Sequence, residues 1–178
     1  MYLSLGSNLG DRAANLATAI ERLRELGEVV AVSSFYETEP MEFADQPWFL
    51  NCAVAVKTEL MPKQLLSRML AIERDMGRRR IRPKGPRIID IDILLFGNSV
   101  IRTPDLEVPH PAMHQRRFVL QPLAEIAPEV RHPGLKRTVR ELLEELPRNA
   151  GTVQRAGAQP KLFDAVARQR TQLDNKSS

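Results

Sequence analysis

The chain has 178 residues, of which 43% are hydrophobic and 27% charged, and its formal net charge is +4. These values are ordinary for a soluble globular domain, and no run approaches the roughly 20 apolar residues that a membrane span needs. The single cysteine, Cys52, excludes an intramolecular disulfide, and the first residues lack the pattern of a signal peptide. We therefore expect a cytoplasmic protein with no membrane partner.

The first part of the chain alternates between strand and helix signals. Tyr2–Leu5 predicts a strand, and the following turn leads to Asp11, which can cap a helix running to about Leu26. The valine-rich segment Glu28–Tyr36 predicts a second strand. Residues 37–48 contain prolines and no clear periodicity, which predicts a long loop.

The same alternation continues through the middle of the chain. Leu50–Lys57 predicts a third strand, Pro62 suits the first turn of a helix that Gly77 ends, and Ile88–Phe96 predicts a fourth strand. The order β-α-β-β-α-β indicates an α+β fold of the ferredoxin-like kind, an antiparallel sheet with two helices on one face.

The remainder of the chain carries weaker signals. Gly97-Asn98 predicts a hairpin turn after which Val100-Ile101 pairs back, whereas residues 116–126 mix apolar patches with loops. Thr138–Leu146 predicts a helix.

The composition becomes polar from Pro147 onward. We expect residues 1–146 to form the folded domain and residues 147–178 to form a mobile C-terminal extension, with a short helix near residues 162–168 as the alternative.

The most informative stretch is residues 78–87, where six of ten side chains are cationic. It leads into an apolar strand that holds Asp90 and Asp92, which point to the same face because side chains alternate along a strand. Two carboxylates on such a strand are costly unless a cation binds them. Carboxylates beside clustered arginines predict a site for magnesium and polyphosphate.

Other interpretations of these residues remain open. The arginine run could be a solvated loop or an RNA-binding patch, although aromatic residues make up only 5% of the chain and none interleaves the run. We therefore expect no nucleic-acid partner. His110 lies between two prolines and is either structural or a phosphate contact. Phe49 and Asn51 share a strand face, which suits a flat heterocycle with donors and acceptors on its edge.

Five separated segments together resemble the 6-hydroxymethyl-7,8-dihydropterin pyrophosphokinases, and the resemblance covers residues 2–146. The segments are Leu5–Asp11, Ser33–Pro40, Asp45–Asn51, Gly85–Leu94 and Val108–Met113. The resemblance implies a ferredoxin-like enzyme of folate biosynthesis that transfers the β,γ-pyrophosphoryl group of ATP to the hydroxymethyl group of a reduced pterin and releases AMP.

The resemblance also implies roles for individual residues. Asp90 and Asp92 would hold two Mg²⁺ ions, and they would form the catalytic set together with Arg80 and Arg87. The residues implied to contact ATP are Glu73, Arg78, Arg80, Arg87, Ile93, His110 and Arg116. Those implied to line the pterin pocket are Thr38, Pro40, Phe49, Asn51 and Phe118, with the ring stacked between the two phenylalanines. Nothing in the sequence requires more than a monomer.

Two hypotheses from other classes compete with this one. An RNA-binding plait would use the basic loop, would bind RNA in a salt-sensitive way and would tolerate Asp90→Asn. A regulatory ATP-binding module would bind nucleotide without any dependence on pterin.

Overall fold

The computed structural model describes residues 1–40, 45–78 and 85–157. Its helices and strands are, in chain order, β1 (Tyr2–Ser7), α1 (Arg12–Leu23), β2 (Glu28–Val32), β3 (Tyr36–Thr38), β4 (Phe49–Lys57), α2 (Pro62–Asp75), β5 (Asp90–Leu95), β6 (Ile101–Arg102), β7 (Glu107–Val108), α3 (Arg117–Ile126), α4 (Val139–Glu145) and β8 (Val153–Arg155). No described helix has the length and apolar character needed to cross a membrane.

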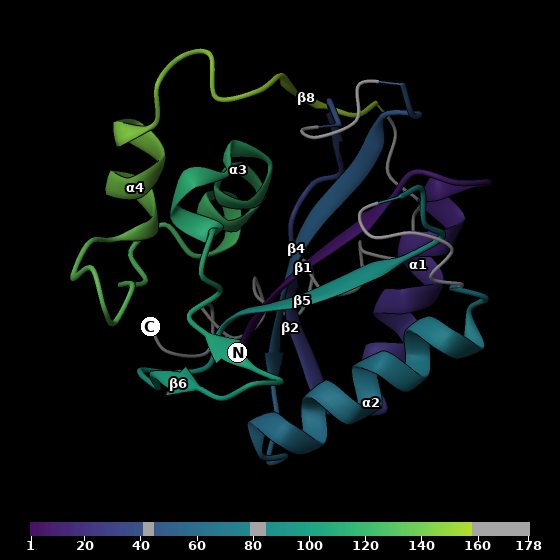
Figure 1. The fold of residues 1–178 in the computed structure, drawn as a ribbon, viewed down its shortest axis with the longest axis horizontal. Coiled ribbons are helices and arrows are strands. Elements are labelled where there is room, and N and C mark those ends of the chain that lie inside the picture. Colours follow the sequence, from purple (N-terminus) through teal and green to yellow (C-terminus); the bar gives the residue numbers. More distant parts are fainter. Residues whose placement is uncertain (41–44, 79–84, 158–178) are drawn as a thin grey trace, which may run out of the picture.

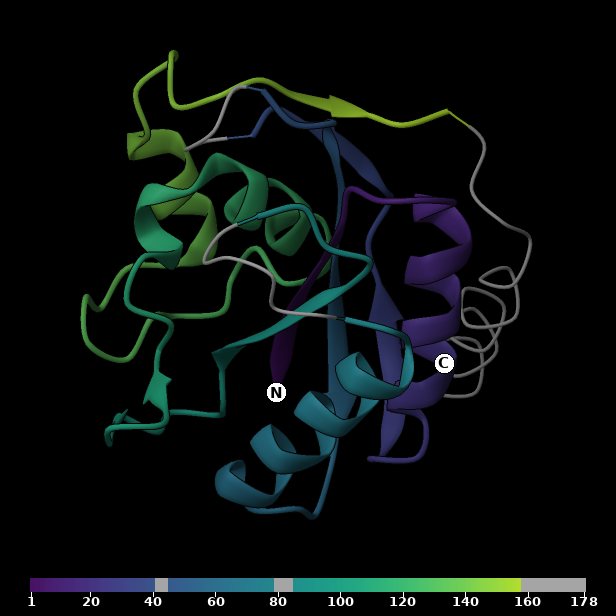
Figure 2. The same ribbon diagram turned by 45° about the vertical axis from the view of Figure 1, so that its right-hand side comes forward.

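An antiparallel sheet forms the centre of the fold, with the strand order β5-β1-β4-β3-β8 and with β2 pairing β4 as well. The helices α1 and α2 cover one face of this sheet, as expected, and α3 and α4 lie on the other side (Figures 1 and 2). The expected α+β fold is confirmed. The two helices expected on one face are present, and in addition α3 packs against the second face.

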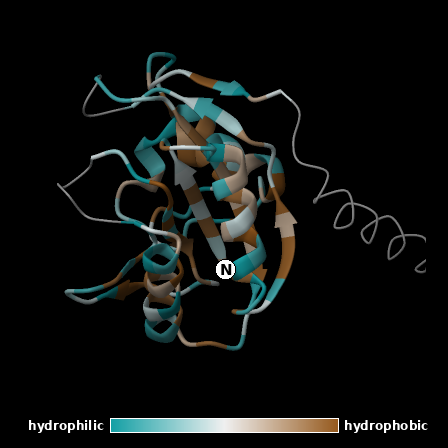
Figure 3. Ribbon diagram, turned by 90° about the vertical axis from the view of Figure 1, so that its right-hand side faces the viewer, coloured by the Kyte–Doolittle hydropathy of each residue, from teal (hydrophilic) through white to brown (hydrophobic). Residues whose placement is uncertain are grey.

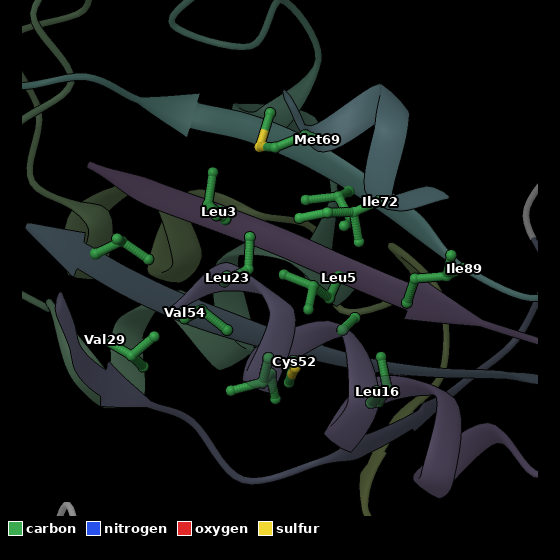
Figure 4. Packing of buried hydrophobic residues seen from close by; sticks show 14 of the residues in the cluster. Leu3, Leu5, Leu16, Leu23, Val29, Cys52, Val54, Met69, Ile72 and Ile89 are labelled. Atoms are coloured by element: carbon green, nitrogen blue, oxygen red, sulfur yellow. The ribbon is translucent and has the colours of Figure 1, made fainter. Parts of the chain in front are cut away.

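Alternation along the strands explains why both faces are covered. Leu3 and Leu5 point to the side of α1 and α2, where they meet Leu16 and Leu23 (Figure 4). Tyr2 and Ala53 belong instead to a second apolar cluster with residues of α3 and α4. Figure 3 shows hydrophobic residues distributed along the strands and helices, with hydrophilic residues between them.

The helix α1 begins where its cap predicts. The Asp11 carboxylate accepts a hydrogen bond from the backbone N–H of Ala14 at 3.0 Å, which satisfies one of the free donors of the first turn. The buried stripe of α1 consists of Leu16, Ala19, Ile20 and Leu23. The helix ends at Leu23, somewhat before the predicted end at Leu26.

The single strand expected over residues 28–36 is divided into β2 and β3. The break falls at Ser33, whose hydroxyl accepts a hydrogen bond from the N–H of Ala53 at 2.9 Å and donates one to the carbonyl of Ser34 at 2.8 Å. Serine hydroxyls compete in this way with the regular ladder. The strand β3 then extends into the segment expected to be a loop.

The prediction of loops for residues 116–126 is wrong, because this segment forms α3. Val119, Leu120 and Leu123 are buried on one side of the helix. Pro122 lies inside α3 and removes one intrahelical hydrogen bond. Because of this proline, the sequence pattern does not predict a helix here. Burial of the apolar stripe offsets that loss.

Two further predictions need correction. Ile101 pairs with Val108 of β7, in a separate two-stranded sheet, and therefore does not fold back onto β5. The folded domain also extends beyond residue 146, because Val153 of β8 pairs with Thr38 of β3. A polar strand of three residues has no sequence signal of its own and depends on the strand that it pairs with. The short helix suggested near residues 162–168 falls outside the described residues.

Candidate active site

A cavity of about 530 Å³ lies over the sheet face opposite α1 and α2. Its position follows from the strand register, in which Gly6 of β1 stands between Asn51 of β4 and Asp90 of β5, and Ser4 stands next to Asp92. The residues that line the cavity are Ser4, Gly6, Thr38, Glu39, Gln46, Phe49, Asn51, Arg78, Arg87, Asp90, Asp92, Ala112, Gln115, Arg116 and Phe118. At this end of the sheet, polar residues replace the apolar ones that α3 covers elsewhere.

One end of the cavity is formed by carboxylates. Asp90 accepts from Arg78 at 2.7 Å and from Arg87 at 2.6 Å, so both of its oxygens are engaged. The pKa of Asp92 is raised to about 7, chiefly by burial and then by the charges of Asp90 and Glu73. The ligand-free site therefore disfavours the charge of Asp92, and a bound cation would relieve this cost.

Glu73 lies behind the carboxylate pair and does not line the cavity. Its side chain is almost completely buried, pairs with Arg78 at 2.5 Å and accepts from the backbone N–H of Ile91 at 2.7 Å. Burial, as the largest cause, raises its pKa. Glu73 thereby links the end of α2 to β5 and fixes Arg78 beside Asp90.

Three arginines bring positive charge into the cavity, namely Arg78, Arg87 and Arg116. The Nε atom of Arg87 is buried and has no hydrogen-bond partner among the described residues. The guanidinium of Arg87 lies 5.7 Å from the centre of the Phe49 ring, and that of Arg116 lies 5.7 Å from the centre of the Phe118 ring. Unsatisfied guanidinium donors are well suited to phosphate oxygens.

The residues present fit a magnesium site. Magnesium is usually held by one or two carboxylates, with phosphate oxygens and waters completing the octahedron. Asp90 and Asp92 supply such a pair on one strand face. In the part of the chain that the structure describes, no group of three or more His, Cys, Asp or Glu residues forms a metal cluster.

The other end of the cavity is lined by aromatic side chains and by an asparagine amide. Asn51 is 4% exposed, and its Nδ2 atom donates to the hydroxyl of Thr38 at 2.5 Å. The amide oxygen is thereby directed to Gly6, where it can accept a hydrogen bond from a ligand. Phe49 and Phe118 line the same end. A flat heterocycle with N–H groups on its edge matches these surfaces.

Substitution of Gly6 by alanine should weaken binding at this end. An added Cβ atom would lie 2.6 Å from Oδ1 of Asn51, so the amide would have to leave its place beside Thr38. We expect a loss of about 1 to 2 kcal/mol in stability and a roughly tenfold weaker affinity for the pterin that the sequence resemblance implies, measured by calorimetry. Gly157→Ala, where an added Cβ meets nothing within 4 Å, is the control. Unchanged affinity in Gly6→Ala would contradict the assignment of this end of the cavity.

Asn8 was not predicted, yet it connects three segments around the site. It is 1% exposed, and its Oδ1 atom accepts from the N–H of Arg87 at 2.8 Å. Its Nδ2 atom donates to Gln46 Oε1 at 3.1 Å and to the carbonyl of Pro47 at 3.2 Å. In the sequence, Gly6-Ser7-Asn8 indicates only a tight turn, because its partners are far away in the chain.

The structure brings most of the predicted site residues together. The predicted residues that line the cavity are Thr38, Phe49, Asn51, Arg78, Arg87, Asp90, Asp92, Arg116 and Phe118. The lining residues that the sequence did not indicate are Ser4, Gly6, Glu39, Gln46, Ala112 and Gln115. Arg80 falls outside the described residues.

Three more predicted residues are not part of the lining. Pro40 is not part of the lining, and Ile93 is 5% exposed within the core on the side of α1 and α2. His110 donates its backbone N–H to Leu94 at 3.0 Å, and its Nδ1 atom accepts from Ala112 at 3.2 Å. Burial, and then the charge of Arg116, lowers the pKa of His110 and so disfavours its charged form. The roles expected for these residues stay predictions.

Comparison with known proteins gives a consistent result. The family model for 7,8-dihydro-6-hydroxymethylpterin-pyrophosphokinase (HPPK) matches residues 2–128. The 2-amino-4-hydroxy-6-hydroxymethyldihydropteridine pyrophosphokinase of Methylorubrum extorquens is 50% identical over 147 residues, which cover 82% of this chain and 92% of that protein. The folic acid synthesis protein FOL1 of Dictyostelium discoideum is 43% identical over 153 residues, or 86% of this chain, which spans only 23% of that longer protein.

The solved structures show the same fold. A crystal structure of Plasmodium falciparum HPPK-DHPS with pterin and p-hydroxybenzoate aligns with a TM-score of 0.66 at 20% sequence identity. The alignment covers 81% of this chain and 41% of that one. Because the family model matches most of this chain and relatives of similar length are up to half identical, the chain belongs to the 7,8-dihydro-6-hydroxymethylpterin-pyrophosphokinase family.

Proposed function

We propose that the cavity binds ATP with Mg²⁺ beside 6-hydroxymethyl-7,8-dihydropterin, and that the protein transfers pyrophosphate from ATP to the pterin in folate biosynthesis. The observation that carries this proposal is the division of one cavity into two chemically different ends. Asp90, Asp92 and Arg87 line the charged end, whereas Phe49 and Asn51 line the other. The names of the relatives of similar length agree with the proposed reaction.

The reaction requires two substrates to be aligned. The hydroxymethyl oxygen of the pterin attacks the β-phosphorus of ATP, and the bond between this phosphorus and the oxygen that bridges to the α-phosphorus breaks. AMP leaves with that oxygen, and the hydroxyl proton is released. Transfers of this kind depend mainly on alignment and on neutralisation of charge, so the protein needs no covalent intermediate.

The charged end is suited to the triphosphate. Asp90 and Asp92 would hold two Mg²⁺ ions, which when bound would neutralise phosphate charge and fix the phosphate conformation. Arg87 and Arg116 would contact phosphate oxygens directly. Arg78 is held by Glu73 and Asp90, so its charge remains in place before ATP arrives. Preorganised charge of this kind is effective because it does not reorient during the reaction.

The aromatic end is suited to the pterin. The ring would stack between Phe49 and Phe118, and the amide oxygen of Asn51 would accept from an N–H group on the ring edge. We propose that a monomer is sufficient, as expected from the sequence. The cytoplasmic location remains an expectation from the single cysteine.

The two competing hypotheses fit the geometry less well. An RNA-binding surface would present its arginines to solvent. Among the described residues of the basic run, the side chains of Arg78 and Arg87 are only 14% and 21% exposed and pair with Asp90. A regulatory nucleotide-binding module has no need for a second, aromatic end. Measurement of turnover separates this last possibility from the proposed enzyme.

The substrate assignment is tested by Phe118→Ala. Loss of one stacking surface should raise the dissociation constant of the pterin by about tenfold or more and leave that of a non-hydrolysable ATP analogue within about twofold, as measured by calorimetry. Equal losses for both ligands would contradict a pterin-specific role. Unchanged pterin affinity would remove Phe118 from the pocket.

A further inference from the structure

The strand β8 lies outside the region that the family model matches, which ends at residue 128. It covers the edge of β3, which pairs with β4 on its other side (Figures 1 and 2). β3 has only three residues, so pairing on one side alone would leave it as a very short edge strand. Such strands are held weakly unless a second element covers them.

Backbone hydrogen bonds at both ends connect β8 to β3. The N–H of Glu39 donates to Thr152 at 3.3 Å, and the N–H of Ala156 donates to Phe35 at 2.8 Å. Hydrogen-bonded pairs alternate along an antiparallel ladder. We therefore expect the intervening pair, Glu37 and Gln154, to exchange hydrogen bonds as well.

The two ends of β3 are held by different groups. At its start, the hydroxyl of Tyr36 donates to Oε2 of Glu125 at 2.7 Å, and Glu125 also accepts from the hydroxyl and the N–H of Ser34. These contacts join β3 directly to α3, and Arg155 of β8 lies 3.9 Å from the same Glu125 carboxylate. Just after β3, the N–H of Glu39 donates to the carbonyl of Thr152, which lies in the segment that leads into β8. Loss of β8 should therefore loosen the later part of β3 most.

That later part forms the wall of the proposed pterin site. Thr38 and Glu39 line the cavity, and Thr38 accepts the hydrogen bond that orients the amide of Asn51. Asp90 and Asp92 lie on β5, at the opposite edge of the sheet, with β1 and β4 in between. A disturbance of β8 should therefore affect the pterin end of the cavity and not the metal and phosphate end.

We propose that β8 is a positioning strand for the pterin pocket, which holds β3 so that Thr38 keeps the Asn51 amide oriented toward the substrate. The inference rests on the proposed function, because it assumes that Thr38 and Asn51 form the pterin end. A segment beyond the family-matched region then sets the affinity for the acceptor substrate without contacting it.

The test uses the full-length chain with Gln154→Pro, which removes a backbone donor in the middle of β8. Calorimetry should give a dissociation constant for 6-hydroxymethyl-7,8-dihydropterin that is about tenfold higher, and one for an ATP analogue with Mg²⁺ that stays within about twofold. Gln154→Ala keeps the backbone N–H and is the matched control, with both affinities unchanged. Hydrogen exchange at the N–H of Glu39 should be faster in Gln154→Pro alone.

A double-mutant cycle tests whether β8 acts through Thr38. Thr38→Val removes the hydroxyl that accepts from Asn51 and should weaken pterin binding by itself. If β8 acts by positioning Thr38, adding Gln154→Pro to Thr38→Val should cause little further loss. Fully additive losses would contradict this route.

The outcomes separate the two proposals. Unchanged pterin affinity in Gln154→Pro, or equal losses for pterin and ATP analogue, would overturn the role of β8. If Thr38→Val weakens pterin binding in the same experiments, the pocket assignment stands although β8 has no part in it. If neither variant affects pterin binding, the pocket assignment fails together with the inference.

Discussion

Asp92→Asn should lower kcat by about 1,000-fold or more and yet make the ligand-free protein more stable. The loss of activity follows because an amide oxygen carries no negative charge and binds Mg²⁺ much more weakly than a carboxylate does. The gain in stability follows because burial and the charges of Asp90 and Glu73 raise the pKa of Asp92 to about 7 in the folded protein. Asparagine has the same shape and carries no charge that must be desolvated.

The stability gained by Asp92→Asn should increase with pH. The unfolded carboxyl titrates near pH 4, so between about pH 4 and 7 the folded state retains a proton that the unfolded chain has lost. The contribution of Asp92 to the stability of the wild type therefore falls as the pH rises from about 4 to 7. Above this window the contribution of Asp92 is constant. We expect Asp92→Asn to be more stable by about 1 to 3 kcal/mol at pH 8 and by almost nothing at pH 4.

Thermal or urea unfolding at the two pH values measures this difference. Asp105→Asn, an exposed aspartate between β6 and β7, is the control and should change neither activity nor stability. Mg²⁺ with an ATP analogue should stabilise the wild type much more than Asp92→Asn. Activity of Asp92→Asn close to that of the wild type would exclude the proposed metal site.

Arg87→Ala should have the second-largest effect, a loss of about 100- to 1,000-fold in kcat/KM for ATP. Arg87 is the residue at which several parts of the site meet, because it pairs with Asp90, lies over Phe49 and is held at its backbone by Asn8. Its side chain lines the cavity and its buried Nε atom has no described hydrogen-bond partner, so we expect the guanidinium to donate to a phosphate oxygen. Removal of the side chain takes away this donor and leaves Asp90 with only Arg78 as a described partner.

Comparison with Arg87→Lys distinguishes charge from geometry. Lysine restores the positive charge but not the planar fork of donors, so we expect it to recover about tenfold of the lost activity. Arg24→Ala is the control, because Arg24 is exposed at the end of α1 and pairs only with Glu21 among the described residues. Full activity of Arg87→Ala in steady-state kinetics would exclude a phosphate contact.

Local signals made much of this fold predictable. The caps and apolar stripes of α1 and α2 lie in neighbouring residues, and so does the alternation that places Asp90 and Asp92 on one strand face. For that reason the sequence indicates the carboxylate pair and its arginines without knowledge of the other strands.

The features that were missed depend on partners far away in the chain. Asn8 bonds to residues 38, 39 and 79 positions away. Glu73 is among the predicted residues, but its bond to the N–H of Ile91, across the space between α2 and β5, has no local signal. The short strand β8 exists because β3 offers it a free edge. Pro122 disfavours a helix locally, but α3 forms because burial of its apolar side against the second face of the sheet stabilises it.

Analysis of the nucleotide product tests the central claim most directly. The protein is incubated with ATP and Mg²⁺, with and without 6-hydroxymethyl-7,8-dihydropterin, and the nucleotides and pterins are separated by chromatography. We predict AMP and the pterin diphosphate in equal amounts, with AMP formed only when the pterin is present. Formation of ADP, or of AMP at the same rate without the pterin, would contradict pyrophosphate transfer between the two ends of the cavity.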